Sequence, residues 1–148
     1  MGTRHDGPAR EVRALDTYIK LIRASNAVSH RIHAHLRDDD LTLSQFGVLE
    51  ALYHLGPLAQ RDLCTKLLQS GGNMTMVVVN LEKRGLVRRD RPPENRRLVI
   101  VRLTPAGRRL IKRVFPRHAA TVAEDLSVLS AAEQRELSRL LKKLGHGA

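Results

Sequence analysis

The stretch from Ser70 to Gly85, SGGNMTMVVVNLEKRG, constrains the fold of this chain more than any other segment. The Ser70 hydroxyl can accept a hydrogen bond from a free backbone N–H, as residues that begin helices do. Gly85 stands where a left-handed residue commonly ends a helix. Between them, four apolar residues recur at the spacing of a single helical face: Met74, Val77, Val78 and Leu81. The pattern predicts an amphipathic α-helix with one face in the core.

The other face of this predicted helix carries no charge, and we call it the uncharged face. A helix face exposed only to water normally carries Glu and Lys. Here the side chains are small, able to form hydrogen bonds, or able to touch a methyl group: Gly71, Gly72, Asn73, Thr75, Met76, Val79 and Asn80. Bases in a DNA major groove offer donors, acceptors and the thymine methyl. The uncharged face is therefore predicted to contact double-stranded DNA.

The net charge of the chain, +11, is concentrated just after this helix. Residues 83–113 contain twelve Lys and Arg against Asp90 and Glu94, which is a net charge of +10. Such a focused basic field next to a predicted groove-binding helix indicates a polyanionic partner. A basic surface kept only for solubility is the alternative, but solubility does not require the charges to cluster.

Length and composition predict one globular domain. The chain has 148 residues, of which 42% are hydrophobic and 28% charged, so it can build a core and is too apolar for disorder. It has no apolar run of membrane-spanning length, and its first ten residues lack a signal-peptide pattern. A single cysteine cannot form an internal disulfide. We therefore expect a cytoplasmic protein with no membrane partner.

Apolar spacing and helix-start residues predict the remaining helices. Capping boxes at Thr42 and Ser130 begin two of them, and Thr104 caps a third. Pro116 is expected to kink or break the helix that Thr104 begins. The predicted helices lie at 11–37, 43–55, 59–68, 105–115 with a continuation to about 129, and 131–144.

Two of the predicted helices, at 59–68 and 70–85, are joined by a tight connection, which is the arrangement of a helix-turn-helix. Two predicted strands follow at 86–90 and 97–103, the second rich in β-branched residues. The segment between the strands has two prolines and several arginines, which suits a stiff, basic, projecting loop. These elements predict a β-hairpin wing beside the helix-turn-helix.

This order of elements resembles the MarR family of bacterial regulators. Three segments carry the resemblance: 41–58 (LTLSQFGVLEALYHLGPL), 70–89 (SGGNMTMVVVNLEKRGLVRR) and 93–110 (PENRRLVIVRLTPAGRRL). The expected fold class is therefore mainly α with a small β-hairpin, in a single domain over 1–148. The resemblance implies a winged helix-turn-helix DNA-binding lobe at 42–110 and dimerisation helices at 10–37 and 116–148.

The resemblance also implies a homodimeric transcriptional regulator, usually a repressor, that binds a palindromic operator. The Ser70–Gly85 helix of each subunit would enter the major groove, and the wing tip the minor groove, where Arg97 matches the family's usual inserted arginine. Family members often have aspartate at the positions of Val79 and Asn95, and those acids help to hold the wing arginine. Ionic bracing of this wing is therefore expected to be absent, or Val79 faces a thymine methyl instead.

The candidate DNA-binding residues come from both helices of the helix-turn-helix and from the wing: Gln60, Arg61, Ser70, Gly71, Gly72, Asn73, Thr75, Met76, Asn80, Lys83, Arg89, Arg91, Arg96 and Arg97. The resemblance further implies a small, often phenolic effector bound between the dimerisation helices and the DNA-binding lobe. By position, the candidate effector contacts are Tyr18, Ile22, His33 and Phe46.

Other functions have less support. A nonspecific architectural DNA binder would share the basic composition but would need no groove-fitting face. RNA binding calls for aromatic stacking platforms, and aromatics make up 3% of the chain. A redox-sensing regulator using Cys64 is a further alternative, although Cys64 lies on the apolar side of a predicted helix, which favours a buried, inert thiol.

Metal binding and catalysis are not expected. His30 and His33 are one helical turn apart, but no CxxC or HExxH pattern supplies further metal ligands. No motif brings together a nucleophile, a base and an orienting group. The chain is accordingly predicted to have no metal, no cofactor and no enzymatic activity.

Overall fold

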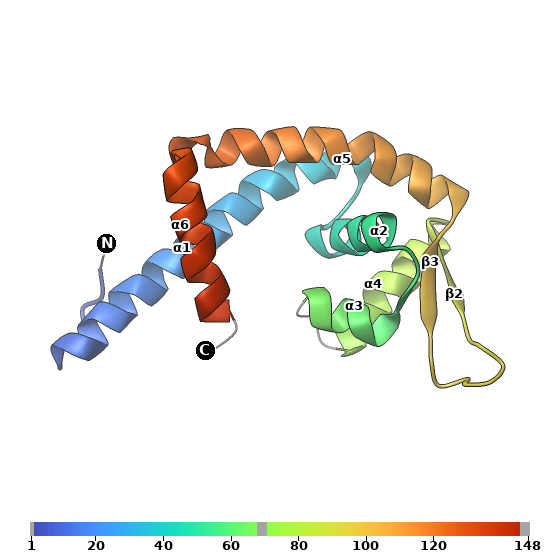
Figure 1. Cartoon of the computed structure of the whole chain (residues 1–148), viewed down its shortest axis with the longest axis horizontal. Helices are drawn as coiled ribbons and strands as arrows, with labels where there is room; N and C mark the ends of the chain where they lie inside the picture. Colours follow the sequence, from blue (N-terminus) through green and yellow to red (C-terminus); the bar gives the residue numbers. More distant parts are fainter. Residues whose placement is uncertain (1, 68–70, 146–148) are drawn as a thin grey trace.

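The computed structural model describes residues 2–67 and 71–145 (Figure 1). In chain order the elements are α1 (Ala9–Leu36), η1 (Arg37–Asp39), α2 (Leu43–Leu55), β1 (Leu58–Ala59), α3 (Gln60–Leu67), α4 (Gly71–Lys83), β2 (Val87–Asp90), β3 (Ile100–Leu103), α5 (Pro105–Asp125), η2 (Leu126–Val128) and α6 (Ala131–Gly145). The predicted fold class is confirmed, because the described chain is mostly helical with one small antiparallel sheet. Within these residues, no helix is both long and apolar enough to span a membrane.

Two long helices, α1 and α5, pack against each other and form a frame across the molecule (Figure 1). A smaller lobe lies beneath one end of α5, where α2 contacts α5 on one side and α3 and α4 on the other. The β2–β3 hairpin projects from this lobe beside α3 and α4, and α6 descends from the far end of α5 (Figure 1). The lobe is therefore attached to the frame through α2.

The core lies mainly in the lobe and uses the side chains that the sequence spacing identified. The predicted apolar stripe of α4 is buried: Met74, Val77, Val78 and Leu81. In α2, Tyr53 is half-buried and four apolar side chains are buried: Phe46, Val48, Leu49 and Leu52. The frame adds Ile32 and Leu36 near the end of α1, and Ile111 and Val114 from α5. The core thus holds the lobe to one end of the frame.

Local hydrogen bonds set the helix ends, as predicted. Thr42 and Gln45 exchange two hydrogen bonds of 3.1 Å, and α2 begins at the next residue. The Ser130 backbone N–H donates to the Glu133 carboxylate and lowers its pKa, while the Glu133 N–H donates back to the Ser130 hydroxyl. Gly85 has a φ of 72°, the left-handed conformation expected at the end of α4.

The sheet has three strands in the order β1-β3-β2, one more than the sequence predicted. Leu58 and Ala59 form the short strand β1, opposite Val101 and Ile100 of β3, so the helix predicted at 59–68 begins one residue later. The second hairpin strand was predicted from residue 97 but begins at Ile100. Residues 97–99 belong to the wing loop instead. There the Leu98 N–H donates to the Asn95 carbonyl, which is a hydrogen bond within a turn rather than between strands.

Pro116 does not break the helix, and α5 continues from Pro105 to Asp125. Proline removes one backbone hydrogen bond, and the buried Val114 and partly buried Phe115 hold the adjacent turn in the core. The ribbon of α5 bends part-way along its length (Figure 1), which fits the predicted kink. The first helix starts at Ala9, two residues before its predicted start.

Candidate nucleic-acid interface

The uncharged face of α4 is open to solvent. Met76 is 63% exposed, a high value for a methionine on the surface of a helix. The other members of this face are exposed, and Val79 is half-buried: Gly71, Gly72, Asn73, Thr75 and Asn80. Ser70, predicted to cap this helix, lies outside the described residues. An exposed face of this composition has the donors, acceptors and apolar atoms that contact base edges.

Gln60 joins three elements of the lobe. Its side-chain amide donates to the Thr75 hydroxyl at 3.0 Å, and that hydroxyl donates to the Gly71 carbonyl at 2.9 Å. Its backbone N–H donates to the Val99 carbonyl at 2.8 Å, next to β3. Gln60 therefore links the start of α3 to both α4 and the wing, whereas its neighbour Arg61 is exposed.

The wing and the helix-turn-helix enclose a hollow of about 360 Å³. Arg97 and Leu98 line it from the wing loop, Arg61 and Cys64 from α3, and Thr75 from α4. Cys64 is half-buried and packs against the core, so it is less buried than predicted. The hollow places the exposed Arg97 on the same side of the lobe as the uncharged face.

The wing loop is held by hydrogen bonds, and among the described residues no acidic side chain pairs with the Arg97 guanidinium. The Asn95 side chain accepts from the Arg97 backbone N–H at 3.2 Å, and its backbone N–H donates to the Pro92 carbonyl at 3.1 Å. The Arg91 guanidinium donates to the Arg96 carbonyl at 2.8 Å. The Asn95 amide therefore holds the backbone of Arg97, whereas the Arg97 guanidinium has no side-chain partner among the residues described.

An ion pair at the base of the wing was not anticipated from the sequence. Arg89 of β2 donates its backbone N–H and two guanidinium N–H groups to Glu82 of α4, at 3.0 to 3.2 Å, and these hydrogen bonds lower the pKa of Glu82. Arg89 was predicted to contact DNA, but its guanidinium is engaged with Glu82. The sequence clue was available, since opposite charges stand seven residues apart across the turn at Gly85.

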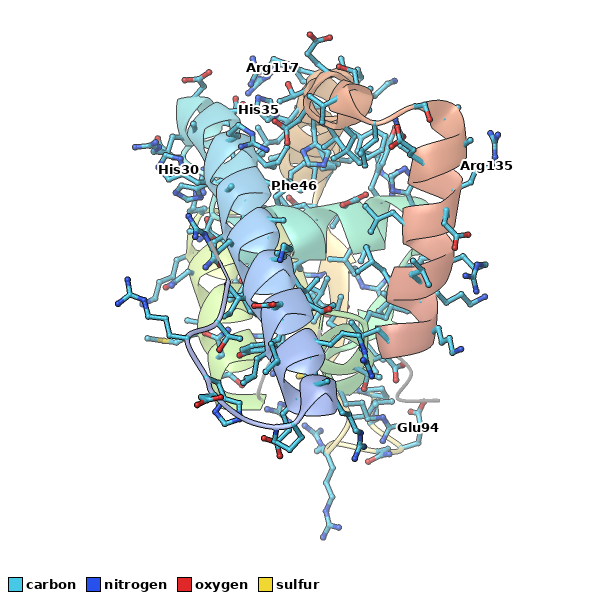
Figure 2. All side chains as sticks on the ribbon, turned by 90° about the vertical axis from the view of Figure 1, so that its left-hand side faces the viewer. His30, His35, Phe46, Glu94, Arg117 and Arg135 are labelled. Carbon is cyan, nitrogen blue, oxygen red and sulfur yellow. The ribbon has the colours of Figure 1, made fainter. Side chains whose placement is uncertain are left out.

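Basic side chains lie close to the uncharged face, and two of them already have partners, since Arg88 pairs with Asp90 and Arg91 donates to the Arg96 carbonyl. Five of them, at the end of α4 and along the wing, are exposed: Lys83, Arg88, Arg91, Arg96 and Arg97. Glu94 lies at the far end of the wing loop (Figure 2). Part of the predicted cluster of basic residues is therefore exposed at the end of α4 and on the wing, while Arg113 pairs with Asp39 beside the frame.

The four candidate effector residues do not meet within one chain. Tyr18 and Ile22 are 59% and 40% exposed in the first half of α1, whereas Phe46 is buried in α2. Tyr18 and His33 are about 22 Å apart along the helix at 1.5 Å per residue. Figure 2 shows His30 and His35 on different sides of α1, and the His35 ring lies 6.0 Å from the His118 ring of α5.

A cluster of aromatic rings, not predicted as a group, lies where α1, α2 and α5 meet. The His118 ring is 4.2 Å from the Phe46 ring and 6.0 Å from the His35 ring, measured between centroids. Phe115 contacts His54 at 4.7 Å on the other side. Burial, and secondarily His35, lower the pKa of His118. Sequence spacing missed the cluster because its members come from three helices.

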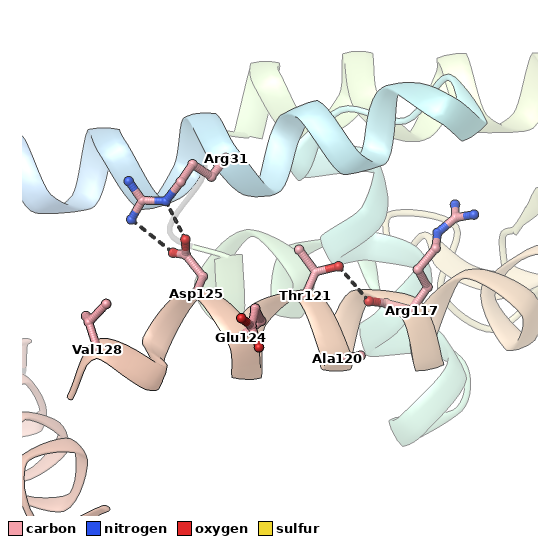
Figure 3. Close-up of a pocket in the computed structure, with 7 residues that line it drawn as sticks. All are labelled: Arg31, Arg117, Ala120, Thr121, Glu124, Asp125 and Val128. Carbon is pink, nitrogen blue, oxygen red and sulfur yellow. Dashed lines mark hydrogen bonds and ion pairs between the residues drawn. The ribbon is translucent and has the colours of Figure 1, made fainter. Parts of the chain in front are cut away.

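Two hollows lie along the frame. One, of about 690 Å³, is lined by α1 and α5, with the Arg31–Asp125 ion pair at one end and Arg117 at the other (Figure 3). The second, of about 350 Å³, lies between α2, α5 and α6, and His118 and Phe115 line it. In the part of the chain that the structure covers, no three His, Cys, Asp or Glu side chains are grouped to hold a metal ion.

Comparison with known proteins gives consistent relationships. The MarR family model matches residues 39–98, from η1 to the wing. MhqR, an HTH-type transcriptional regulator of Bacillus subtilis (strain 168), is 34% identical over 136 residues, which cover 92% of this chain and 94% of MhqR.

Solved structures are similar over most of the chain. AbsC, a MarR family transcriptional regulator from Streptomyces coelicolor, superposes with a TM-score of 0.85 at 21% identity and 97% coverage of both chains. BpsR of Bordetella bronchiseptica, whose DNA binding is regulated by 6-hydroxynicotinic acid, gives a TM-score of 0.80 at 28% identity, covering 87% of this chain and 98% of BpsR. Similarity to a regulator over nearly the whole length, with the family model on the helix-turn-helix and wing, shows that this chain belongs to the MarR family of DNA-binding transcriptional regulators.

Proposed function

We propose that two copies of this chain bind one palindromic operator, each placing α4 in the major groove and its wing in the minor groove. The observation that carries this proposal is the exposed, uncharged face of α4 with exposed arginines on the wing beside it. Base contacts would come from Asn73, Thr75, Met76 and Asn80, with Gly71 and Gly72 allowing close approach. Phosphate and minor-groove contacts would come from Gln60, Arg61, Lys83, Arg91, Arg96 and Arg97.

The frame helices supply the proposed dimer interface. Members of the family act as dimers. In this chain α6 has a leucine stripe that the described residues leave 40–61% exposed: Leu137, Leu140, Leu141 and Leu144. The first half of α1 adds Leu15, Tyr18 and Ile22, which are also exposed. Apolar side chains repeated along one helix face are stabilised when another helix covers them, so we assign 10–37 and 116–148 to dimerisation and 42–110 to DNA binding.

We further propose that the protein is a repressor released by a small hydroxylated aromatic molecule. The hollow between α2, α5 and α6 borders both the lobe and the frame, and aromatic rings line it. His118 lines this hollow and contacts Phe46, and among the described residues no group hydrogen-bonds its Nδ1 atom. Regulation of BpsR by 6-hydroxynicotinic acid is a precedent for such a ligand. The molecule would release DNA by favouring a dimer with the wrong spacing.

Selection from a random duplex library tests the DNA-binding proposal. The purified protein should enrich an inverted repeat whose half-sites are about one helical turn apart. Its affinity for that duplex should exceed its affinity for a scrambled duplex by about 10³-fold or more. A ratio near one would instead identify a nonspecific architectural DNA binder.

Titration with hydroxylated aromatic acids, beginning with 6-hydroxynicotinic acid, tests the effector proposal. A ligand that binds and lowers affinity for the selected duplex supports it. Binding measured by calorimetry with no change in DNA affinity would contradict release by that ligand.

A further inference from the structure

Three elements of the structure meet at Asp39, in the turn between the frame and the lobe. Arg84, one residue beyond α4, donates to the Asp40 carbonyl at 2.7 Å and to the Asp39 carbonyl at 3.3 Å. The Asp39 carboxylate accepts hydrogen bonds from two arginines of α5, Arg113 at 3.2 Å and Arg117. One residue thus joins the end of the predicted DNA-contacting helix to the frame.

At this junction, the side chain of Asp39 and the backbone of Asp40 are both held in place. The Asp39 side chain is 10% exposed, whereas Arg113 and Arg117 are 70% and 52% exposed, so the arginines cover the carboxylate. Asp40 has a φ of 54° and is the one non-glycine residue among those described that adopts the left-handed conformation. That conformation ends η1, and it is stabilised where the Asp40 N–H donates to the Arg37 carbonyl and the Leu41 N–H to the Leu36 carbonyl. The two carbonyls that Arg84 binds are therefore held in place.

We propose that Asp39 is a positioning residue for DNA binding: it sets the orientation of α4 relative to the α1–α5 frame without contacting DNA. The inference depends on the proposed dimer. Because the proposed dimer interface consists of α1 of the frame and of α6, which follows α5, the angle between lobe and frame determines the distance between the two copies of α4. Binding to a palindrome requires that distance to match the half-site spacing, and one base pair changes the spacing by about 3.4 Å.

Loss of the Asp39 carboxylate has opposite expected effects on DNA binding, depending on whether it acts through net charge or through the position of α4. Removing an acid from a chain of net charge +11 strengthens its attraction to phosphates, so nonspecific affinity should stay the same or rise. Loss of positioning should instead weaken binding only at the correctly spaced site. At the junction, Arg113 and Arg117 would lose the carboxylate that they share, and repulsion among these arginines and the nearby Arg84 would loosen the contact.

The test compares Asp39→Asn with Asp38→Asn. The Asp38 side chain is exposed, and the two substitutions change the net charge by the same amount. Affinities are measured for the duplex that the wild-type protein selects, for versions with half-sites one base pair closer or farther apart, and for a scrambled duplex. For Asp39→Asn we expect about a tenfold loss on the selected duplex, a weaker preference for its spacing, and unchanged or tighter binding to scrambled DNA. Asp38→Asn should retain the wild-type preference.

A second variant, Arg84→Lys, keeps the charge but replaces a guanidinium that reaches two carbonyls by a single ammonium group. It should also weaken the spacing preference. Wild-type spacing preference in both Asp39→Asn and Arg84→Lys would overturn the inference, as would equal weakening in Asp38→Asn. Retained binding to scrambled DNA shows that the variants are folded. Failure of the wild-type protein to select any duplex would instead contradict the proposed function itself.

Discussion

At the scale of single residues, Arg97 has the most distinctive setting in the wing. Its backbone N–H is tied to Asn95, while its exposed guanidinium has no side-chain partner among the residues that the structure describes. A fixed backbone with a free charged end suits insertion into a narrow groove.

We expect Arg97→Ala to weaken binding to the selected duplex by about 1–3 kcal/mol, as loss of a groove contact does. Arg135→Ala is the control, because Arg135 points outward from α6 (Figure 2) and its loss changes the net charge equally. Fluorescence anisotropy at fixed salt measures both affinities. Equal effects of the two substitutions would mean that Arg97 acts only through net charge.

His118 is the residue whose protonation is most closely linked to folding in the pH range near neutrality. Burial and His35 hold its pKa below the usual value of about 6.5, so the unfolded chain binds more protons than the folded chain. The free energy of unfolding should therefore fall as the pH drops from about 7.5 to about 5.5, above the range in which the lowered carboxylate pKa values matter.

Urea denaturation across that pH range tests this prediction. In His118→Phe, which preserves a ring against Phe46, the free energy of unfolding should fall less as the pH drops. In His30→Gln, which replaces an exposed histidine of α1, it should match the wild-type fall. An unchanged fall in His118→Phe would assign the pH dependence to other groups.

At the scale of elements, the helices were largely predictable because their ends depend on neighbouring residues. Thr42, Thr104 and Ser130 cap helices where the sequence placed them. The strand β1 was not predictable, because two residues have no periodicity and Leu58 and Ala59 form a strand only where β3 is available. Helix packing separated two neighbouring histidines: His33 and His35 are about 200° apart around α1, and His35 is the one beside the His118 ring.

Close contact between α5 and the residue before β2 leaves no room for a side chain at Gly107. A Cβ on Gly107 would lie 2.0 Å from the Leu86 carbonyl oxygen, a contact that only a backbone shift can relieve. We expect Gly107→Ala to destabilise the protein by about 1–3 kcal/mol, as overpacking does.

Gly72→Ala is the matched control, because nothing lies within 4 Å of a Cβ at that helical position. Alanine favours a helix over glycine, so this variant should gain up to about 1 kcal/mol. Thermal or urea denaturation measures both. Destabilisation of similar size in the two variants would contradict the packing explanation.

At the scale of the whole molecule, the proposed dimer depends on the exposed leucine stripe of α6. Leu141→Glu should produce a monomer in analytical ultracentrifugation, because a buried carboxylate without a partner is costly at an apolar interface. Operator affinity should fall with it. Leu55→Glu, at an exposed leucine near the end of α2, is the control and should remain dimeric. A dimeric Leu141→Glu would place the interface elsewhere.

The amino-acid sequence by itself determined the helices, the wing, the buried stripe and uncharged face of α4, and the concentration of charge after it. Each of these depends on local spacing or composition, which a linear chain already contains. The tertiary structure decided which side chains from distant segments meet: Glu82 with Arg89 across the turn, His118 with Phe46 and His35, and Asp39 with Arg84, Arg113 and Arg117. Such contacts depend on how helices pack, and packing is set by the whole core rather than by any one segment.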